Sequence, residues 1–228
     1  MKRNILMRLE ARRFLTILLI AMLMATARTF PLKAHPHILA EAHLEIVLNA
    51  TGTVDRLKHL WRFDEFFSST VILEFGAAGS MELDEEELDA VSRTIHTSLA
   101  DFNYFQSIES NGEEIVMRPP AGLRAYFDDL QLIVEFETEP RDPLPLRGSL
   151  TFGIYDPTLF TAIEFQEDEH ISIGRLPADC DTAIIRPDPY QVIAENRGSL
   201  TEEFFNDPTD YAAISATRLE VACPPGPE

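Results

Sequence analysis

The stretch HILAEAHLEIVLNATGTVDRLKHLWRF, residues 37–63, decides the N-terminal fold, because apolar and polar side chains alternate through it. A period of two residues is typical of a β-strand that buries one face. Residues 49–52, Asn-Ala-Thr-Gly, favour a turn between two such strands. We therefore predict a β-hairpin. Its first strand has Pro36, Ile38, Ala40, Ala42, Leu44, Ile46 and Leu48 on one face and His35, His37, Leu39, Glu41, His43, Glu45 and Val47 on the other. Its second strand has Val54, Arg56, Lys58 and Leu60 on one face and Leu57, His59, Trp61 and Phe63 on the other.

Residues 1–34, which precede the hairpin, have the pattern of a signal peptide. Basic residues are followed by the apolar run 14–25, which is shorter than the roughly 20 residues that a membrane-spanning helix needs. Cleavage after Ala34 would make His35 the first residue, whereas cleavage after Ala27 would leave it inside the mature chain. We expect a periplasmic protein that has no membrane span after signal cleavage, because no later segment is long and apolar enough to cross a bilayer.

The chain is strongly acidic. Its net charge is −19, and removal of residues 1–34 leaves 12 Lys and Arg against 37 Asp and Glu, a net charge of −25. Such a surface repels nucleic acid and anionic lipid and concentrates cations around it. We therefore expect no nucleic-acid partner, and the alternative to a cation-attracting role is that the charge serves solubility alone.

The two cysteines, Cys180 and Cys223, are the only ones in a chain that we expect to be exported. An oxidising compartment favours a disulfide between them, and a pair of thiolate metal ligands is the alternative.

Two helices are expected after the hairpin. Phe67, Val71 and Phe75 are spaced four apart in residues 64–75. Asp84 and Glu87 have the spacing of a capping box, which begins a second helix that we expect to run to about Tyr104.

Short β-rich runs follow residue 111, namely 114–118, 123–127, 130–138, 146–155, 160–165, 170–174 and 217–222, with a helical turn at 201–206. The fold class predicted is α+β, with an N-terminal β-hairpin and helices followed by an antiparallel β-sandwich-like half. The predicted regions are the signal peptide 1–34, the hairpin and helical region 35–110, and the β-rich region 111–228.

Histidines and carboxylates supply the candidate chemistry. Imidazoles and carboxylates bind zinc, nickel or copper, and strand alternation would aim His35, His37, Glu41 and His43 the same way. Neighbours two apart on a strand are separated by roughly 6.6 Å, so another element must contribute a ligand. We therefore predict His35, His37 and His59 as ligands, with Asp64 or Glu65 completing the site; the alternative is a solvated strand face. Pro36 has no N–H and excludes square-planar binding through the second amide nitrogen.

The other candidates have simpler interpretations. His96 borders the apolar face of the long helix, and Asp156 precedes a proline and is typical of a turn. His170 ends an acidic run, which indicates a solvated hairpin tip or an exposed cation site. The chain has no nucleophile elbow, zinc-protease motif or phosphate-binding loop, so we predict no enzyme activity.

Several short motifs occur in an order that resembles one known family. They are His35-Pro36-His37, the run His59 to Phe67, the acidic helix ending in Asn103-Tyr104-Phe105, and Tyr155-Asp156-Pro157-Thr158. Together they resemble the periplasmic domain-of-unknown-function family number one thousand and seven. That resemblance implies the periplasmic component of an uncharacterised ABC-type transport system, often encoded beside nickel, cobalt or zinc transport genes.

The resemblance also implies a calcium-loop-like segment before the long helix, but this chain departs from it. With Glu87 as the closing glutamate, Gly76, Ala78 and Ser80 would occupy the first ligand positions and Met81 would replace the turn glycine. These residues provide at most one hydroxyl, so calcium binding there is not expected.

The sequence leaves three hypotheses about function. The first is an exported accessory or binding protein of a zinc, nickel or cobalt transport system, whose partners are the divalent metal ion and an inner-membrane metal transporter. The second is an acidic module that docks on a membrane transporter without binding metal. The third is a copper enzyme that uses an N-terminal histidine.

Overall fold

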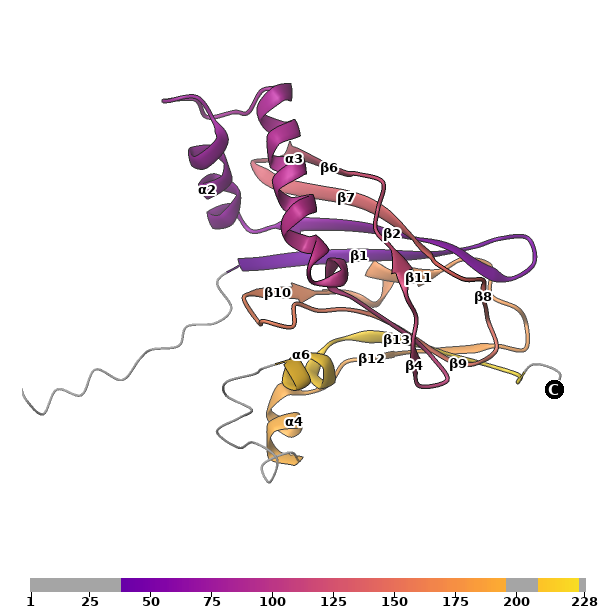
Figure 1. Cartoon of the computed structure of the whole chain (residues 1–228). Coiled ribbons are helices and arrows are strands. Elements are labelled where there is room, and N and C mark those ends of the chain that lie inside the picture. Colours follow the sequence, from indigo (N-terminus) through magenta and orange to yellow (C-terminus); the bar gives the residue numbers. More distant parts are fainter. Residues whose placement is uncertain (1–37, 196–208, 226–228) are drawn as a thin grey trace, which may run out of the picture. The chain divides into compact units, whose positions relative to one another are not determined.

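The computed structural model describes residues 38–195 and 209–225, which form two β-sheets and a few helices (Figure 1). The α+β class is confirmed. Residues 1–34, His35, His37 and the expected helical turn at 201–206 lie outside the described residues. Among the residues that are described, no helix is long and apolar enough to cross a membrane.

The first sheet is built on the predicted hairpin, β1 (Ile38–Leu48) and β2 (Thr53–Phe63). Its strand order is β10-β1-β2-β7-β5, and β11, β6 and β8 pair with β1, β7 and β2. The remaining strands of this sheet are β5 (Met117–Arg118), β6 (Leu123–Asp128), β7 (Gln131–Pro140), β8 (Leu144–Pro145), β10 (Thr161–Glu164) and β11 (Ile171–Ile173).

A β-bulge changes the predicted face of Val54. The register passes from Val47 opposite Arg56 to Leu48 opposite Val54, so Asp55 is the extra residue on β2. An extra residue reverses the alternation beyond it. Val54 is therefore buried with Leu57, whereas the sequence pattern had placed it with Lys58.

The outer edge of β1 pairs in parallel, which the antiparallel expectation did not include. Ile38 to Glu41 lie beside β10, and Leu44 to Ile46 lie beside β11. This pairing brings the short 3-10 helix η2 (Asp168–His170), which precedes β11, next to the hairpin.

The second sheet has the order β12-β13-β9-β3-β4. Its strands are β3 (Gln106–Ser110), β4 (Glu113–Glu114), β9 (Gly148–Ile154), β12 (Asp181–Ile185) and β13 (Arg218–Cys223). One continuous core joins the sheets, with Leu44, Leu57 and Trp61 from the first and Leu150 and Phe152 from the second. The predicted regions 35–110 and 111–228 share both sheets, since β3 pairs with β9 and β2 pairs with β7.

The predicted disulfide is confirmed. Cys180, just before β12, is bonded to Cys223 at the end of β13.

The predicted helices are α2 (Glu65–Phe75) and α3 (Glu85–Ala100). Asp84 and Glu87 form the capping box of α3, as expected. This helix ends at Ala100 and not near Tyr104, because Asn103, Tyr104 and Phe105 have positive φ and form the irregular turn η1 (Asn103–Phe105). Two short helices that the sequence did not predict are α4 (Pro189–Glu195) and α6 (Thr209–Ser215).

Candidate metal centre

Three potential ligands meet where η2 approaches β1. Glu41 and His43 lie two residues apart on the same face of β1, and His170 is the last residue of η2. His170 Nδ1 is 3.3 Å from Glu41 Oε1, and His43 Nε2 is 3.6 Å from the same oxygen. One donor atom from each of the three residues lies within 4.8 Å of the others. The parallel pairing of β1 with β10 and β11 is what brings these residues together.

These separations suit a shared metal ion. Donors bound to one tetrahedral zinc at about 2.1 Å stand roughly 3.4 Å apart, close to both distances from Glu41. Two imidazoles and one carboxylate form a donor set that zinc, nickel, cobalt and copper accept.

The surroundings of His43 and His170 leave imidazole nitrogens available to a metal ion. His170 Nδ1 is buried and, among the described residues, makes no hydrogen bond, although Glu41 lies beside it. The ring centroids of His43 and His170 are 3.9 Å apart. Burial lowers the pKa of His43, the neighbouring His170 lowers it further, and Glu41 raises it by less. A neutral His43 has a free lone pair for a metal ion.

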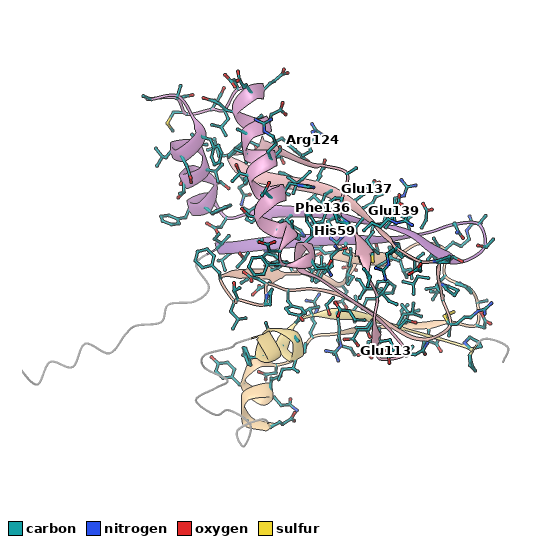
Figure 2. The ribbon with its side chains drawn as sticks, in the orientation of Figure 1. His59, Glu113, Arg124, Phe136, Glu137 and Glu139 are labelled. Carbon is teal, nitrogen blue, oxygen red and sulfur yellow. A yellow bond between two sulfur atoms is a disulfide. The ribbon has the colours of Figure 1, made fainter. Side chains whose placement is uncertain are left out.

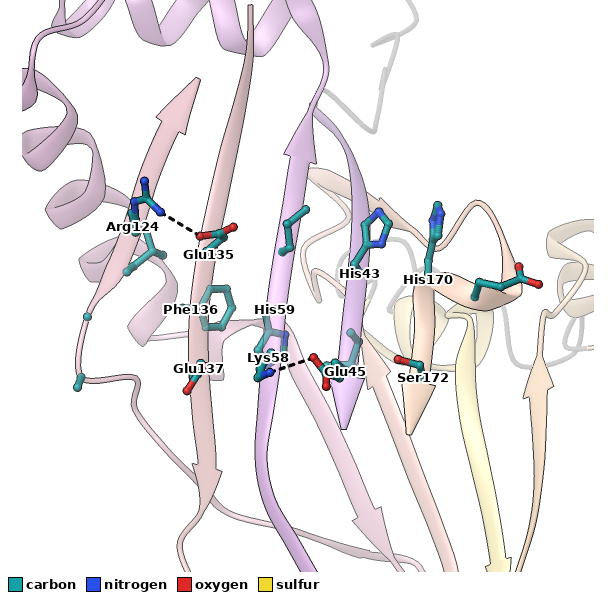
Figure 3. Close-up of a pocket in the computed structure, with 16 residues that line it drawn as sticks. His43, Glu45, Lys58, His59, Arg124, Glu135, Phe136, Glu137, His170 and Ser172 are labelled. Carbon is teal, nitrogen blue, oxygen red and sulfur yellow. Dashed lines mark hydrogen bonds and ion pairs between the residues drawn. The ribbon is translucent and has the colours of Figure 1, made fainter. Parts of the chain in front are cut away.

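The cluster is half-buried and opens toward a hollow. The side chains of Glu41, His43 and His170 are 23%, 43% and 17% exposed. A hollow of about 880 Å³, lined by His43 and His170, extends over the outer face of the first sheet. Figure 3 shows these histidines at one side of it, with the Lys58–Glu45 pair (3.1 Å) beside His43 and the Arg124–Glu135 pair (3.6 Å) across the sheet. A ligand or solvent molecule could therefore reach a bound ion from this side.

His59 lies on the opposite face of the hairpin from His43. It pairs with Leu44, is 2% exposed, and its ring stacks on Phe136 at a centroid distance of 4.4 Å (Figure 2). Its Nε2 is 3.4 Å from the Thr138 hydroxyl. Burial lowers the pKa of His59 to about 3. The structure therefore does not bring His59 to the Glu41–His43 face.

The other predicted residues have local structural roles. Asp64 caps α2 by accepting from the Phe67 N–H at 2.9 Å, and it also accepts from the Leu39 N–H. Glu65 is exposed in the first turn of α2. His96 contacts the Pro120 carbonyl and the Tyr104 hydroxyl. The Asp156 carboxylate accepts from the backbone N–H groups of Thr158 and Thr161, as a turn-forming aspartate should.

The sequence contained part of the signal for this cluster. Alternation placed Glu41 and His43 on one face, and the acidic run before His170 left an exposed cation site open as the alternative to a solvated hairpin tip. No local pattern indicates that His170 would lie beside β1, because parallel pairing joins segments that are distant in the sequence.

Comparison with known proteins assigns no activity. No curated protein sequence matches the chain. Two distant structural matches are the acetylcholine-binding protein of Bulinus truncatus (9% identity, 89% of this chain and 94% of that chain, TM-score 0.31) and acetylcholine-binding protein type 1 of Biomphalaria glabrata (11%, 88% and 92%, TM-score 0.27). At these scores neither supports an inference about this chain.

A family model gives the informative match. Residues 19–223 match the model described as protein of unknown function (DUF1007). Because the match covers most of the chain, and with it both sheets and the Glu41–His43–His170 cluster, this protein belongs to the DUF1007 family.

Proposed function

We propose that this protein binds a divalent transition metal through Glu41, His43 and His170. In this proposal it is an exported accessory or binding protein of a zinc, nickel or cobalt transport system. The observation that carries the proposal is the meeting of three donor atoms within 4.8 Å, one of them a buried imidazole nitrogen that makes no hydrogen bond within residues 38–195 and 209–225.

A site of this type suits a protein that hands on its metal ion better than one in which the metal ion stabilises the fold. Structural zinc sites are closed by four protein ligands, whereas three ligands leave a position open. Here His43 and His170 line the hollow, from which an incoming ligand could take the metal. The acidic surface would concentrate cations near the site.

His35 and His37 remain proposed ligands, and either one would occupy the open position until an incoming ligand displaced it. Alternation along the sequence predicts the Glu41 and His43 face for both, and export with cleavage after Ala34 would add a free amine at His35. A periplasmic location is part of this proposal.

Calorimetry and native mass spectrometry with zinc, nickel and cobalt test the site. We expect near-stoichiometric binding by the wild type and at least a hundredfold weaker binding by a His43→Ala/His170→Ala variant, because one carboxylate would remain. Glu45→Gln is the matched control, since Glu45 lies on the same face of β1 but pairs with Lys58. A His35→Ala/His37→Ala variant measures what those two residues add.

Two results would refute the assignment. If the His43/His170 variant bound metal as tightly as the wild type, the site would lie elsewhere. If the wild type bound none of the three metals, the metal-handling role would be wrong.

A further inference from the structure

Helix α2 has more apolar side chains than it buries against the core. Six of its eleven residues are apolar, yet Val71 is the buried apolar residue and Phe67 and Phe75 pack against the core only in part. A helix that is apolar on all sides is normally covered on all sides. Phe66 and Leu73 are instead 78% and 83% exposed.

These two residues form an exposed apolar stripe that two polar side chains interrupt. They are seven apart and therefore share one face of the helix. Ser69 and Thr70 lie between them, and both hydroxyls donate to the Phe66 carbonyl, so their polar groups are bonded to the helix itself. Met81, on the connection from α2 to α3, is also 78% exposed.

The same region carries charge of one sign. Residues 63–92 contain nine Asp and Glu and no Lys, Arg or His. Asp64, Asp84 and Glu87 are used as helix caps. Glu65, Glu74, Glu82, Glu85, Glu86 and Asp89 remain, and within the described part of the chain no ion pair joins any of them to a basic residue.

We infer that the α2 stripe, defined as Phe66 and Leu73, is a docking surface for a basic amphipathic helix of a partner protein. Apolar residues of that helix would cover the stripe, and its Lys and Arg would face the surrounding glutamates. A second copy of this chain would bring like charges together, and an anionic lipid surface would be repelled. This inference does not depend on metal binding.

Binding of a model peptide tests the inference. The probe is a peptide of about 18 residues, roughly five turns, with Leu on one helical face and Lys and Arg on the other. A scrambled peptide of the same composition has no apolar face and is the peptide control. We expect saturable binding of the probe to the purified chain, weakened about tenfold or more when salt rises from about 0.05 M to about 0.5 M.

Two sets of variants locate the surface. Phe66→Ser/Leu73→Ser should weaken probe binding about tenfold or more, whereas Leu130→Ser/Tyr190→Ser, which removes equally exposed residues elsewhere, should not. Glu65→Gln/Glu74→Gln/Glu82→Gln should reduce the salt dependence. Glu109→Gln/Glu113→Gln/Glu114→Gln removes the same charge from β3 and β4 of the second sheet, where Figure 2 shows Glu113, and should leave it unchanged.

Several outcomes would overturn the inference. The first is that the scrambled peptide binds as tightly as the probe. The second is that the wild type does not bind the probe. The third is that the control variants lose as much affinity for the probe as the test variants do. Concentration-dependent dimerisation that Phe66→Ser/Leu73→Ser abolishes would assign the stripe to a second copy. Binding to vesicles that this variant abolishes would assign it to lipid. Circular dichroism confirms that each variant retains its fold, and the charge variants test the surface without changing an apolar residue.

Discussion

His59 is a polar residue at the centre of the core, held by a short chain of hydrogen bonds. The Thr138 hydroxyl donates to Gln106 Oε1 at 2.5 Å, so its single proton is used. The 3.4 Å contact with His59 Nε2 then requires Nε2–H to be the donor. Nδ1 holds the lone pair, and among the described residues it has no partner. A second proton on this ring would place an uncompensated charge in the core.

This arrangement predicts how stability depends on pH. The folded pKa of His59 is about 3, and the unfolded value is about 6.5. As pH falls through this interval the unfolded chain binds a proton that the folded chain does not, so stability is full above pH 6.5 and declines below it. Between about pH 6.5 and pH 5 the contribution lost is roughly 2 kcal/mol.

Urea unfolding of His59→Gln measures this contribution. As pH falls from about 6.5 to about 5, we expect the free energy of unfolding to drop by roughly 2 kcal/mol more in the wild type than in the variant, because glutamine does not titrate. His96→Gln is the control, since His96 is only partly buried. If the free energy of unfolding changed with pH by the same amount in the wild type and in His59→Gln, His59 would not be held neutral in the folded protein.

At the level of elements, Ser68 joins α2 to the first sheet. Its hydroxyl is buried, accepts from the Leu132 N–H at 2.8 Å, and donates to the Asp64 carbonyl at 2.7 Å. It thus links the first turn of α2 to the start of β7. The neighbouring Ser69 is exposed, and its hydroxyl donates to the Phe66 carbonyl of the same helix.

Replacing Ser68 by alanine should be costly. The buried Leu132 N–H would lose its partner, and an unsatisfied buried donor destabilises by about 1–3 kcal/mol. Thermal or urea unfolding should show that loss for Ser68→Ala and less than about 0.5 kcal/mol for Ser69→Ala. Equal effects of the two changes would mean that water replaces the hydroxyl.

Elements with strong local patterns were predictable from the sequence. Alternation gave the β1–β2 hairpin, and Asp84 with Glu87 gave the start of α3. The bulge at Asp55 was not predictable, because alternation does not reveal an extra residue. The second-sheet strands β3 and β12 were missed, since both are short and flanked by irregular segments.

The candidate site was predictable only on its β1 side. Glu41 and His43 share a strand face, which local alternation reveals. His170 joins them through a parallel pairing between distant segments. The position of His59 could have been read from the residues that share its strand face. Neighbouring Leu57, Trp61 and Phe63 marked its face as apolar, and that was the better guide.

At the scale of the whole molecule, strand spacing indicated a sandwich but not which strand joins which sheet. Strands β7 and β9 follow one another with only β8 between them, yet they lie in different sheets. The chain therefore crosses between layers several times, and each sheet depends on segments from both halves. Contacts at long sequence separation hold such a topology together, and the disulfide adds a covalent one.

The Cys180–Cys223 bond should contribute a large share of the stability. It joins residues 43 apart, and the chain-entropy estimate for a loop of that length is about 4 kcal/mol. Because β13 pairs with both β12 and β9, the bond also holds the last strand in the second sheet. We expect a Cys180→Ser/Cys223→Ser variant to lose about 3–4 kcal/mol in urea unfolding.

The free energy of unfolding of the double variant is compared with that of the oxidised wild type. The reduced wild type is the matched control, because it keeps both cysteines but lacks the disulfide. Reduction should lower stability to nearly that of the double variant. If both retained the stability of the oxidised protein, the constraint on the unfolded chain would be negligible, and the pairing of β13 with β9 and β12 would suffice to hold the C-terminal strand.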